Sequence, residues 1–281
     1  MPRLATVSEI RDALAPVHRR GASVGLVPTM GALHEGHLSL IRAARETNDV
    51  VVVSIFVNPT QFGPNEDLER YPRDVEGDSR KCAETGADLI FSPSVEEMYP
   101  GPHSTWVEVE GLTAGLCGRS RPGHFRGVCT VLAKLFNICR PDRAYFGEKD
   151  AQQLAVVTRM VRNLDFPVQI VPCPTVREPD GLAMSSRNAR LTPEERAQAP
   201  TLYRSLRAAQ ERIRAGERDA AALEEIIRSV LTEAPLAEID YVEIVRADDL
   251  SPVAILTGDC LMAVAVKFGG TRLIDNLRVS A

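Results

Sequence analysis

The sequence predicts an α/β protein, in which a doubly wound parallel sheet is followed by a smaller α+β domain. Continuous apolar runs rich in β-branched residues alternate with helical segments as far as about Val176. This alternation is typical of a parallel sheet covered by helices on both faces. Beyond that point helices come first, and strands with short connections follow. We therefore expect one domain at residues 1–176 and a smaller domain at residues 177–281.

The individual elements follow from the chain in order. Residues 1–14 predict a capped amphipathic helix, because Thr6 and Glu9 have the spacing of a capping box. The apolar runs of the first domain predict strands at residues 23–29, 49–57, 87–93, 142–147 and 167–176, with helices at residues 36–46, 72–86, 126–140 and 150–164. The second domain is expected to contain helices at residues 192–216 and 219–234 and strands at residues 239–247, 259–269 and 271–279.

Composition limits the classes of function. The chain has 281 residues, 44% of them hydrophobic and 25% charged, as in an ordinary globular protein with a sizeable core. A net charge of -5 argues against a general nucleic-acid binder. No apolar run reaches the roughly 20 residues of a membrane helix, so no membrane association is expected. The 6 cysteines are scattered without a C-x-x-C pair, which favours reduced thiols in a cytoplasmic protein.

The stretch PTMGALHEGHL, residues 28–38, joins the first long strand to its helix. It carries His34 and His37, two of only 5 histidines, together with Gly31 and Gly36. A helix start at the carboxyl end of a parallel strand presents free N–H groups and a positive dipole end to an anion. Three interpretations stay open on spacing alone: a phosphate site, a metal site and a structural turn. A P-loop is excluded because no G-x-x-x-x-G-K-[ST] occurs.

A second candidate stretch, FGEKDAQQL at residues 146–154, lies on the same expected edge of the sheet. Lys149 is one of four lysines in an arginine-rich chain, and its ammonium group suits a phosphate. A solvated surface lysine is the alternative. Asp150 is also the type of residue that caps a helix. Gln152 and Gln153 are consecutive and must point to different faces, so we expect at most one to reach a site.

Four further sets of residues are candidates for the site, and the last three also have a structural interpretation. Asn58 and Gln61 follow the second strand and carry amide groups suited to a small polar substrate. The loop at residues 63–73 is either a lid or an ordinary long loop. In residues 177–191, Ser185, Ser186 and Arg187 are donors suited to phosphate oxygens, and the alternative is a mobile polar linker. Residues 117–127, with three arginines and His124, are either a basic wall or an exposed turn.

Together these stretches resemble a known motif set. PTMGALHEGHLSL, SIFVNPTQFGPNEDLERYPR, RPGHFRGV, FGEKDAQQL and DGLAMSSRN are similar, in order and spacing, to the motifs of the pantothenate synthetase (pantoate–β-alanine ligase) family. The resemblance implies a Rossmann-like fold of the HxGH nucleotidylyltransferase type. It also implies that pantoate reacts with ATP to give pantoyl adenylate and pyrophosphate. β-Alanine then takes the acyl group and AMP is released.

The resemblance also implies the site residues. His37, as proton donor, His34 and Lys149 are expected to be catalytic. The expected ATP residues are Met30, Gly31, Ala32, Leu33, His34, Glu35, Gly36, His37, Gly147, Glu148, Lys149, Asp150, Val176, Met184, Ser185, Ser186 and Arg187. Gln61 and Gln153 are expected to hold pantoate, with Asn58 as a further substrate residue and Gln61 beside β-alanine. No protein side chain is expected to be a direct metal ligand, Mg²⁺ accompanies the ATP phosphates, and the protein is expected to be a homodimer with a C-terminal lid.

The MSSR segment at Met184–Arg187 is similar to the KMSKS-type signature of the wider superfamily. Its lysines are missing here, so Lys149 is expected to supply that charge. Two other classes of function stay open. One is a nucleotidylyltransferase of the same fold that transfers AMP or CMP to a phosphorylated acceptor. The other is a non-catalytic ATP-binding module.

Overall fold

The computed structural model describes residues 1–64, 66 and 68–280. The chain forms two compact units that are not single continuous segments. The N-terminal unit contains Met1–Val109, Arg121–Glu148 and Val156–Pro174. The C-terminal unit contains Glu110–Ser120, Lys149–Ala155 and the chain from Thr175 onward. Each unit is described by itself below.

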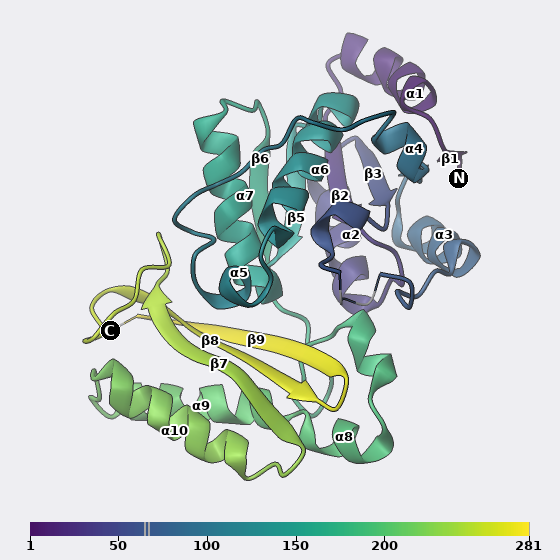
Figure 1. The fold of residues 1–281 in the computed structure, drawn as a ribbon. Helices are drawn as coiled ribbons and strands as arrows, with labels where there is room; N and C mark the ends of the chain where they lie inside the picture. Colours follow the sequence, from purple (N-terminus) through teal and green to yellow (C-terminus); the bar gives the residue numbers. More distant parts are fainter. Residues whose placement is uncertain (65, 67, 281) are drawn as a thin grey trace. The chain divides into compact units, whose positions relative to one another are not determined.

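A six-stranded parallel sheet forms the centre of the N-terminal unit, with strand order β1-β4-β3-β2-β5-β6. Figure 1 shows these strands among the purple to teal helices. Their bounds are β1 (Arg3–Leu4), β2 (Val24–Thr29), β3 (Val50–Ile55), β4 (Leu89–Phe91), β5 (Arg143–Gly147) and β6 (Gln169–Cys173). The predicted fold class is confirmed, and the continuous apolar character of the central strands is explained by burial: every residue of β3 is buried.

Helices pack around the parallel sheet of the N-terminal unit. Their bounds are α1 (Val7–Arg19), α2 (Glu35–Thr47), α3 (Val75–Thr85), α4 (Val95–Met98), α6 (His124–Cys139) and α7 (Ala151–Asn163), whose first residues are assigned to the C-terminal unit. Helix α2 packs on β2, β3 and β5 with α3 beside it, while α1 packs against α6. On α2 the residues Leu40, Ile41 and Ala44 are buried, the three- and four-residue spacing of one helix face. The predicted Thr6–Glu9 capping box of α1 is confirmed.

The strand order places a topological switch at β2. From β2 the chain continues to β3 and β4 on one side of the sheet, whereas β5 and β6 lie on the other side of β2. Open parallel sheets bind ligands outside the carboxyl ends of their strands at such a point. The segments that follow β2, β3 and β5 are therefore the first places to look for a site.

The C-terminal unit is an antiparallel sheet with helices. Its strands β7 (Ala237–Arg246), β8 (Asp259–Phe268) and β9 (Thr271–Ser280) pair in that order, with a bulge between Ile239 and Tyr241. The helices are α5 (Leu116–Ser120), α8 (Pro193–Gln198), α9 (Thr201–Arg214) and α10 (Ala220–Thr232). Helices α9 and α10 pack on each other and on the sheet, as Figure 1 shows in green, and their apolar side chains form one buried cluster with those of β8.

Two expectations about elements need correction. The helix predicted at residues 192–216 is two helices, α8 and α9, which are separated at Ala199 and Pro200. Proline has no N–H to donate, so the hydrogen-bond ladder is interrupted there. The short β1 and α5 have too few residues for a periodic signal and were not predicted. Among the described residues, no helix is long and apolar enough to cross a membrane.

Candidate active site

The carboxyl ends of three neighbouring strands carry most of the polar residues that the sequence singled out in the N-terminal unit. Strand β2 pairs with β3 through Thr29 opposite Ile55, and on its other side with β5. Because the strands are parallel, their following segments lie at one edge of the sheet. These segments are Met30–His37 after β2, Asn58–Gln61 after β3, and Gly147–Glu148 at the end of β5.

The turn after β2 is shaped by a buried carboxylate. Asp78 on α3 is 1% exposed, and its two oxygens accept the backbone N–H groups of Ala32 and Leu33, each at 2.8 Å. Gly31 has a φ of +85°, and a Cβ there would lie 3.0 Å from an Asp78 carboxylate oxygen. Glycine is thus required both for the backbone conformation and for the approach of Asp78. Lys81 adds a bond from its ammonium group to the Leu33 carbonyl at 2.7 Å.

The two histidines form the cap of α2. Nδ1 of His34 accepts the Gly36 N–H at 3.2 Å, and Nδ1 of His37 accepts the His34 N–H at 3.4 Å, so the pair makes a reciprocal capping box. Their ring centroids are 4.1 Å apart. Since each Nδ1 serves as an acceptor, the neutral rings carry their proton on Nε2. The turn therefore presents imidazole N–H donors at the positive end of a helix, a combination suited to phosphate oxygens.

Asn58 and Gln61 belong to one internal network after β3. The Asn58 amide group donates to Oε1 of Gln61 at 3.1 Å and to the Gly127 carbonyl at 3.2 Å. Its oxygen accepts from the Tyr99 hydroxyl at 2.8 Å and from the Thr60 hydroxyl at 2.9 Å. Burial raises the pKa of the Tyr99 phenol, which remains a neutral donor. Asn58 is 1% exposed, so its amide holds the network together.

The orientation of the Gln61 amide follows from that network. Since Oε1 accepts from Asn58, Nε2 is the end directed at Met30, where it contacts the thioether sulfur at 2.8 Å. A thioether is a weak acceptor. Gln61 therefore retains a donor whose better partner is an oxygen of a ligand.

In the C-terminal unit, the Lys149–Ala155 segment is held at its backbone and by one of its two glutamines. Asn276 on β9 donates to the Lys149 carbonyl at 2.8 Å. The Lys149 ammonium group lies 3.8 Å from the Asp150 carboxylate. Gln152 is 7% exposed and donates to the carbonyls of Leu112 and Gly115, both at 2.9 Å. Gln152 is thus used inside the unit, which leaves Gln153, half-buried, as the glutamine that can face a ligand.

The segment with Val176 and Met184–Arg187 is a hairpin-like loop ending in a 3₁₀ turn. The Met184 N–H donates to the Val176 carbonyl at 3.0 Å, and the Ser185 hydroxyl caps the 3₁₀ turn Ser186–Arg190 by accepting the Arg187 N–H at 3.2 Å. The loop is anchored by Arg177, which forms a two-pronged ion pair with the buried Asp275. Of the two alternatives, the mobile linker is not what the structure shows, because the loop is braced by these contacts.

One expectation concerns a loop of the N-terminal unit, and another concerns metal ligands. The loop proposed as a lid, residues 63–73, includes Asn65 and Asp67, which lie outside the described residues. Glu66 in that loop is described, and both its carboxylate oxygens contact the Arg121 guanidinium, at 2.7 and 2.5 Å. Within the part of the chain that the structure describes, no group of three His, Cys, Asp or Glu side chains is arranged to hold a metal ion.

Sequence reasoning missed the residues that brace these segments. The backbone of the first turn is held by Asp78 and Lys81 on α3, and the backbone at Lys149 is held by Asn276 on β9. Asp275 on β9 pairs with Arg177, which anchors the loop of Met184–Arg187. Each of these four residues lies 45 or more residues along the chain from its partner. The one available signal was Asp78, a charged residue at a position that α3 turns toward the core.

Comparison with known proteins identifies the family of the chain. A family model described as pantoate-beta-alanine ligase matches residues 3–278. The chain belongs to the pantoate–β-alanine ligase family. Membership in this family makes the chain a ligase of pantothenate biosynthesis, and it confirms the family expected from the five motifs.

Relatives and solved structures of the pantoate–β-alanine ligase family match over the full chain. The pantothenate synthetase of Moorella thermoacetica is 58% identical over 277 residues, 99% of this chain and 98% of that protein. The crystal structure of pantothenate synthetase from Thermus thermophilus is 51% identical, with a TM-score of 0.95 and 100% of both chains covered. The enzyme from Francisella tularensis, solved with beta-gamma ATP and β-alanine, is 35% identical, with a TM-score of 0.82 over 99% of this chain and 97% of that one.

Proposed function

We propose that the protein joins pantoate to β-alanine in two steps on ATP. In the first step a pantoate carboxylate oxygen attacks the α-phosphorus, the bond from that phosphorus to the bridging oxygen breaks, and pyrophosphate leaves. In the second step the β-alanine amine attacks the acyl carbon, AMP leaves with the bonding electrons, and the nitrogen loses a proton. The observation that carries the proposal is the His34–His37 cap at the switch point of a sheet in a member of this family.

ATP is proposed to bind at the strand-end segments. Attack at an α-phosphate depends mainly on positioning and on charge stabilisation. The imidazole groups of His34 and His37 donate hydrogen bonds to phosphate oxygens, His37 in its imidazolium form is the proton donor of the family pattern, and Lys149 supplies a further positive charge. The full proposed set, taken from the family pattern, is Met30–His37, Gly147–Asp150, Val176 and Met184–Arg187. That residues of both units act on one nucleotide rests on this pattern.

Pantoate is proposed to bind at Gln61 and Gln153. The Gln61 donor that now contacts the Met30 sulfur would be better paired with the carboxylate or a hydroxyl of pantoate. Asn58 contributes by holding the Gln61 amide, since its own amide is fully engaged. β-Alanine is proposed to enter beside Gln61 after pyrophosphate has left.

ATP is proposed to enter as its Mg²⁺ complex, with the ion held by phosphate oxygens and water. Magnesium sites that use substrate phosphates need few protein ligands, which agrees with a donor set of imidazoles, amides and one lysine. The ion neutralises charge on the leaving pyrophosphate when bound.

Three further properties are proposed from the family pattern. Residues 1–176 form the domain for nucleotide and pantoate, and residues 177–281 form a lid domain. The active protein is a homodimer. Its location is cytoplasmic, which is supported by six buried cysteine thiols without disulfides.

The test of this function is AMP formation from ATP with each acceptor supplied in turn. AMP release should need pantoate and β-alanine together under turnover conditions. A nucleotidylyltransferase of the same fold would need a phosphorylated acceptor and would leave the nucleotide on the product. Stoichiometric ATP binding with no AMP under any condition would indicate a non-catalytic module instead.

A further inference from the structure

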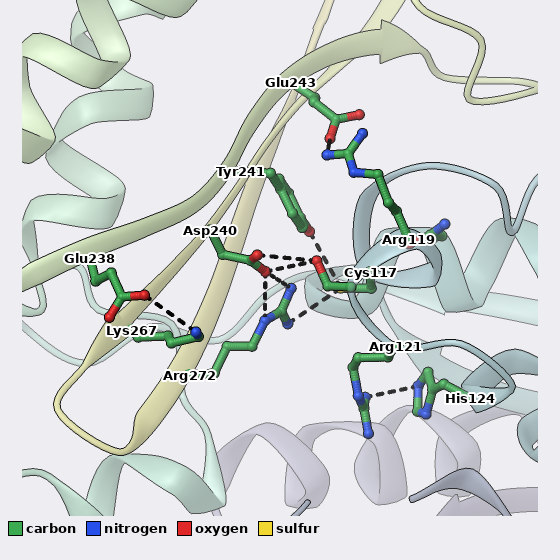
Figure 2. Close-up of polar contacts among 12 residues, drawn as sticks. Cys117, Arg119, Arg121, His124, Glu238, Asp240, Tyr241, Glu243, Lys267 and Arg272 are labelled. Carbon is green, nitrogen blue, oxygen red and sulfur yellow. Dashed lines mark hydrogen bonds and ion pairs between the residues drawn. The ribbon is translucent and has the colours of Figure 1, made fainter. Parts of the chain in front are cut away.

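Residues 117–127 were expected to be a basic wall or an exposed turn, and the part that belongs to the N-terminal unit, residues 121–127, has a specific arrangement. Arg121 and His124 lie at the start of α6, and Figure 2 shows them in contact. Nη1 of Arg121 lies 3.1 Å from Nε2 of His124, and Nδ1 of His124 lies 2.8 Å from the Gln61 carbonyl oxygen. A carbonyl oxygen only accepts, so Nδ1 of His124 carries the proton and Nε2 accepts from Arg121.

Arg121 also reaches the same carbonyl directly. Its Nη2 donates to the Gln61 carbonyl at 3.3 Å, while Nε and Nη2 bind the Glu66 carboxylate. The side chains of Arg121 and Glu66 are 17% and 24% exposed, so the pair is partly shielded from water. Burial alone would raise the pKa of the Glu66 carboxyl group, but the Arg121 guanidinium outweighs it and lowers that pKa below its ordinary value. The guanidinium is therefore occupied within the protein and is not a free basic wall.

The backbone of α6 also packs closely against the turn that carries Gln61. Gly127 on α6 lies so close to the 3₁₀ turn Pro59–Gln61 that a Cβ there would be 2.3 Å from the Thr60 carbonyl oxygen and 2.7 Å from the Gln61 Cα. Gly127 also offers its own carbonyl to Asn58, the residue that orients the Gln61 amide. The first turns of α6 thus determine both where the Gln61 backbone lies and which way its side chain points.

We propose that Arg121 is a positioning residue for pantoate, acting through Gln61. Together with His124 and Glu66 it holds the Gln61 carbonyl, so that Nε2 of the Gln61 side chain is presented to the substrate. Arg121 itself does not touch pantoate. The inference rests on the proposed function, because it assumes that Gln61 binds pantoate.

The test is a steady-state comparison of variants with pantoate and ATP varied separately. Arg121→Ala should raise the KM for pantoate by about tenfold or more and change the KM for ATP by less than about twofold. Arg121→Lys, which keeps the charge but loses the planar fork, should fall between the wild type and Arg121→Ala. A purely structural role would shift both KM values together or lower only the concentration of folded enzyme.

Arg119→Ala is the matched control. Arg119 is two residues away, pairs with Glu243 within the C-terminal unit as Figure 2 shows, and has a side chain that is 57% exposed. Its loss should leave both KM values within about twofold of the wild type, since exposed ion pairs contribute little. If Arg121→Ala does not fold, Glu66→Gln is measured instead, and it should give the same selective rise for pantoate at smaller size.

Gln61→Ala separates the failure of this inference from the failure of the proposed function. A rise in the pantoate KM for Gln61→Ala with none for Arg121→Ala and Glu66→Gln would overturn the positioning role and leave the function standing. An unchanged pantoate KM in Gln61→Ala would remove Gln61 from the pantoate site, and the inference would fall with that assignment.

Discussion

The turn after β2 and the turn after β5 are braced in different ways. In the first, both oxygens of the buried Asp78 carboxylate accept backbone N–H groups of the turn, and the two histidines cap their own helix. In the second, the carbonyl of Lys149 accepts a hydrogen bond from Asn276 on the C-terminal strand β9. These contacts of the first turn lie within the N-terminal unit, whereas the backbone at Lys149 belongs to the C-terminal unit.

This difference teaches which parts of the chain each proposed catalytic group depends on. The turn that carries His34 and His37 is held by its own cap and by Asp78 and Lys81 on α3. Lys149 needs the last strand of the chain, because its partner Asn276 comes 127 residues later in the sequence. Changes that loosen the C-terminal sheet should therefore disturb the backbone at Lys149.

The largest expected effect comes from removing the proposed catalytic groups themselves. His37→Ala and Lys149→Ala should each lower the rate of adenylate formation by about 10²–10³, the usual cost of losing one donor to developing charge. Circular dichroism and thermal unfolding should show a folded protein in both cases. Near-normal adenylate formation by either folded variant would contradict the assignment of that residue.

Substitution of the two consecutive glutamines should have different effects, on pantoate use for Gln153→Ala and on stability for Gln152→Ala. Gln153→Ala should weaken the use of pantoate by roughly 1–3 kcal/mol, because polar groups of the substrate are left unpaired, with little change for ATP. Gln152→Ala removes the bonds to Leu112 and Gly115 and should mainly lower the melting temperature. An equal rise in the KM values for pantoate and ATP in Gln153→Ala would show that Gln153 faces elsewhere.

Asp78→Asn and Asn276→Ala sharpen the comparison between the two turns. An asparagine offers one acceptor oxygen where Asp78 offers two, so one buried N–H of the first turn loses its partner. The free energy of unfolding should fall by about 1–3 kcal/mol. Asn276→Ala removes the side-chain bond to the Lys149 carbonyl. This should cost about 1 kcal/mol in stability, with the larger loss in the rate of adenylate formation. Both variants are measured by urea unfolding and by single-turnover kinetics. Equal losses of stability and equal losses of rate in the two variants would contradict the comparison.

A last effect is a decline of stability at alkaline pH caused by Cys82, which lies in the same buried cluster as Leu33 of the first turn. Burial, with a contribution from the Asp78 carboxylate, raises the pKa of this thiol to about 12. The unfolded thiol ionises at about pH 8.5 while the folded one stays neutral, so stability falls as the pH rises above that value, by at most about 1.4 kcal/mol per pH unit. Urea unfolding at about pH 7.5 and pH 9.5 should show a weaker decline in Cys82→Ala than in the wild type.

Local patterns in the sequence were sufficient for the fold and for where the site segments begin. The apolar runs located the parallel strands, and the histidine–glycine turn was placed correctly between β2 and α2. Long-range braces were not predictable, since nothing near Asp78 or Asn276 in sequence indicates that they hold backbone groups of distant segments. The role of Arg121 was equally hidden, because a run of arginines has the same composition whether it faces solvent or a partly buried carboxylate.

The central claim is that the nucleotide segments carry out the first step without β-alanine. The most direct measurement is the exchange of labelled pyrophosphate into ATP. It should require pantoate and Mg²⁺ and should proceed with β-alanine absent, because the attack on the α-phosphorus uses only the groups around ATP and pantoate. Exchange that appears only when β-alanine is added, or that occurs without pantoate, would contradict the two-step mechanism.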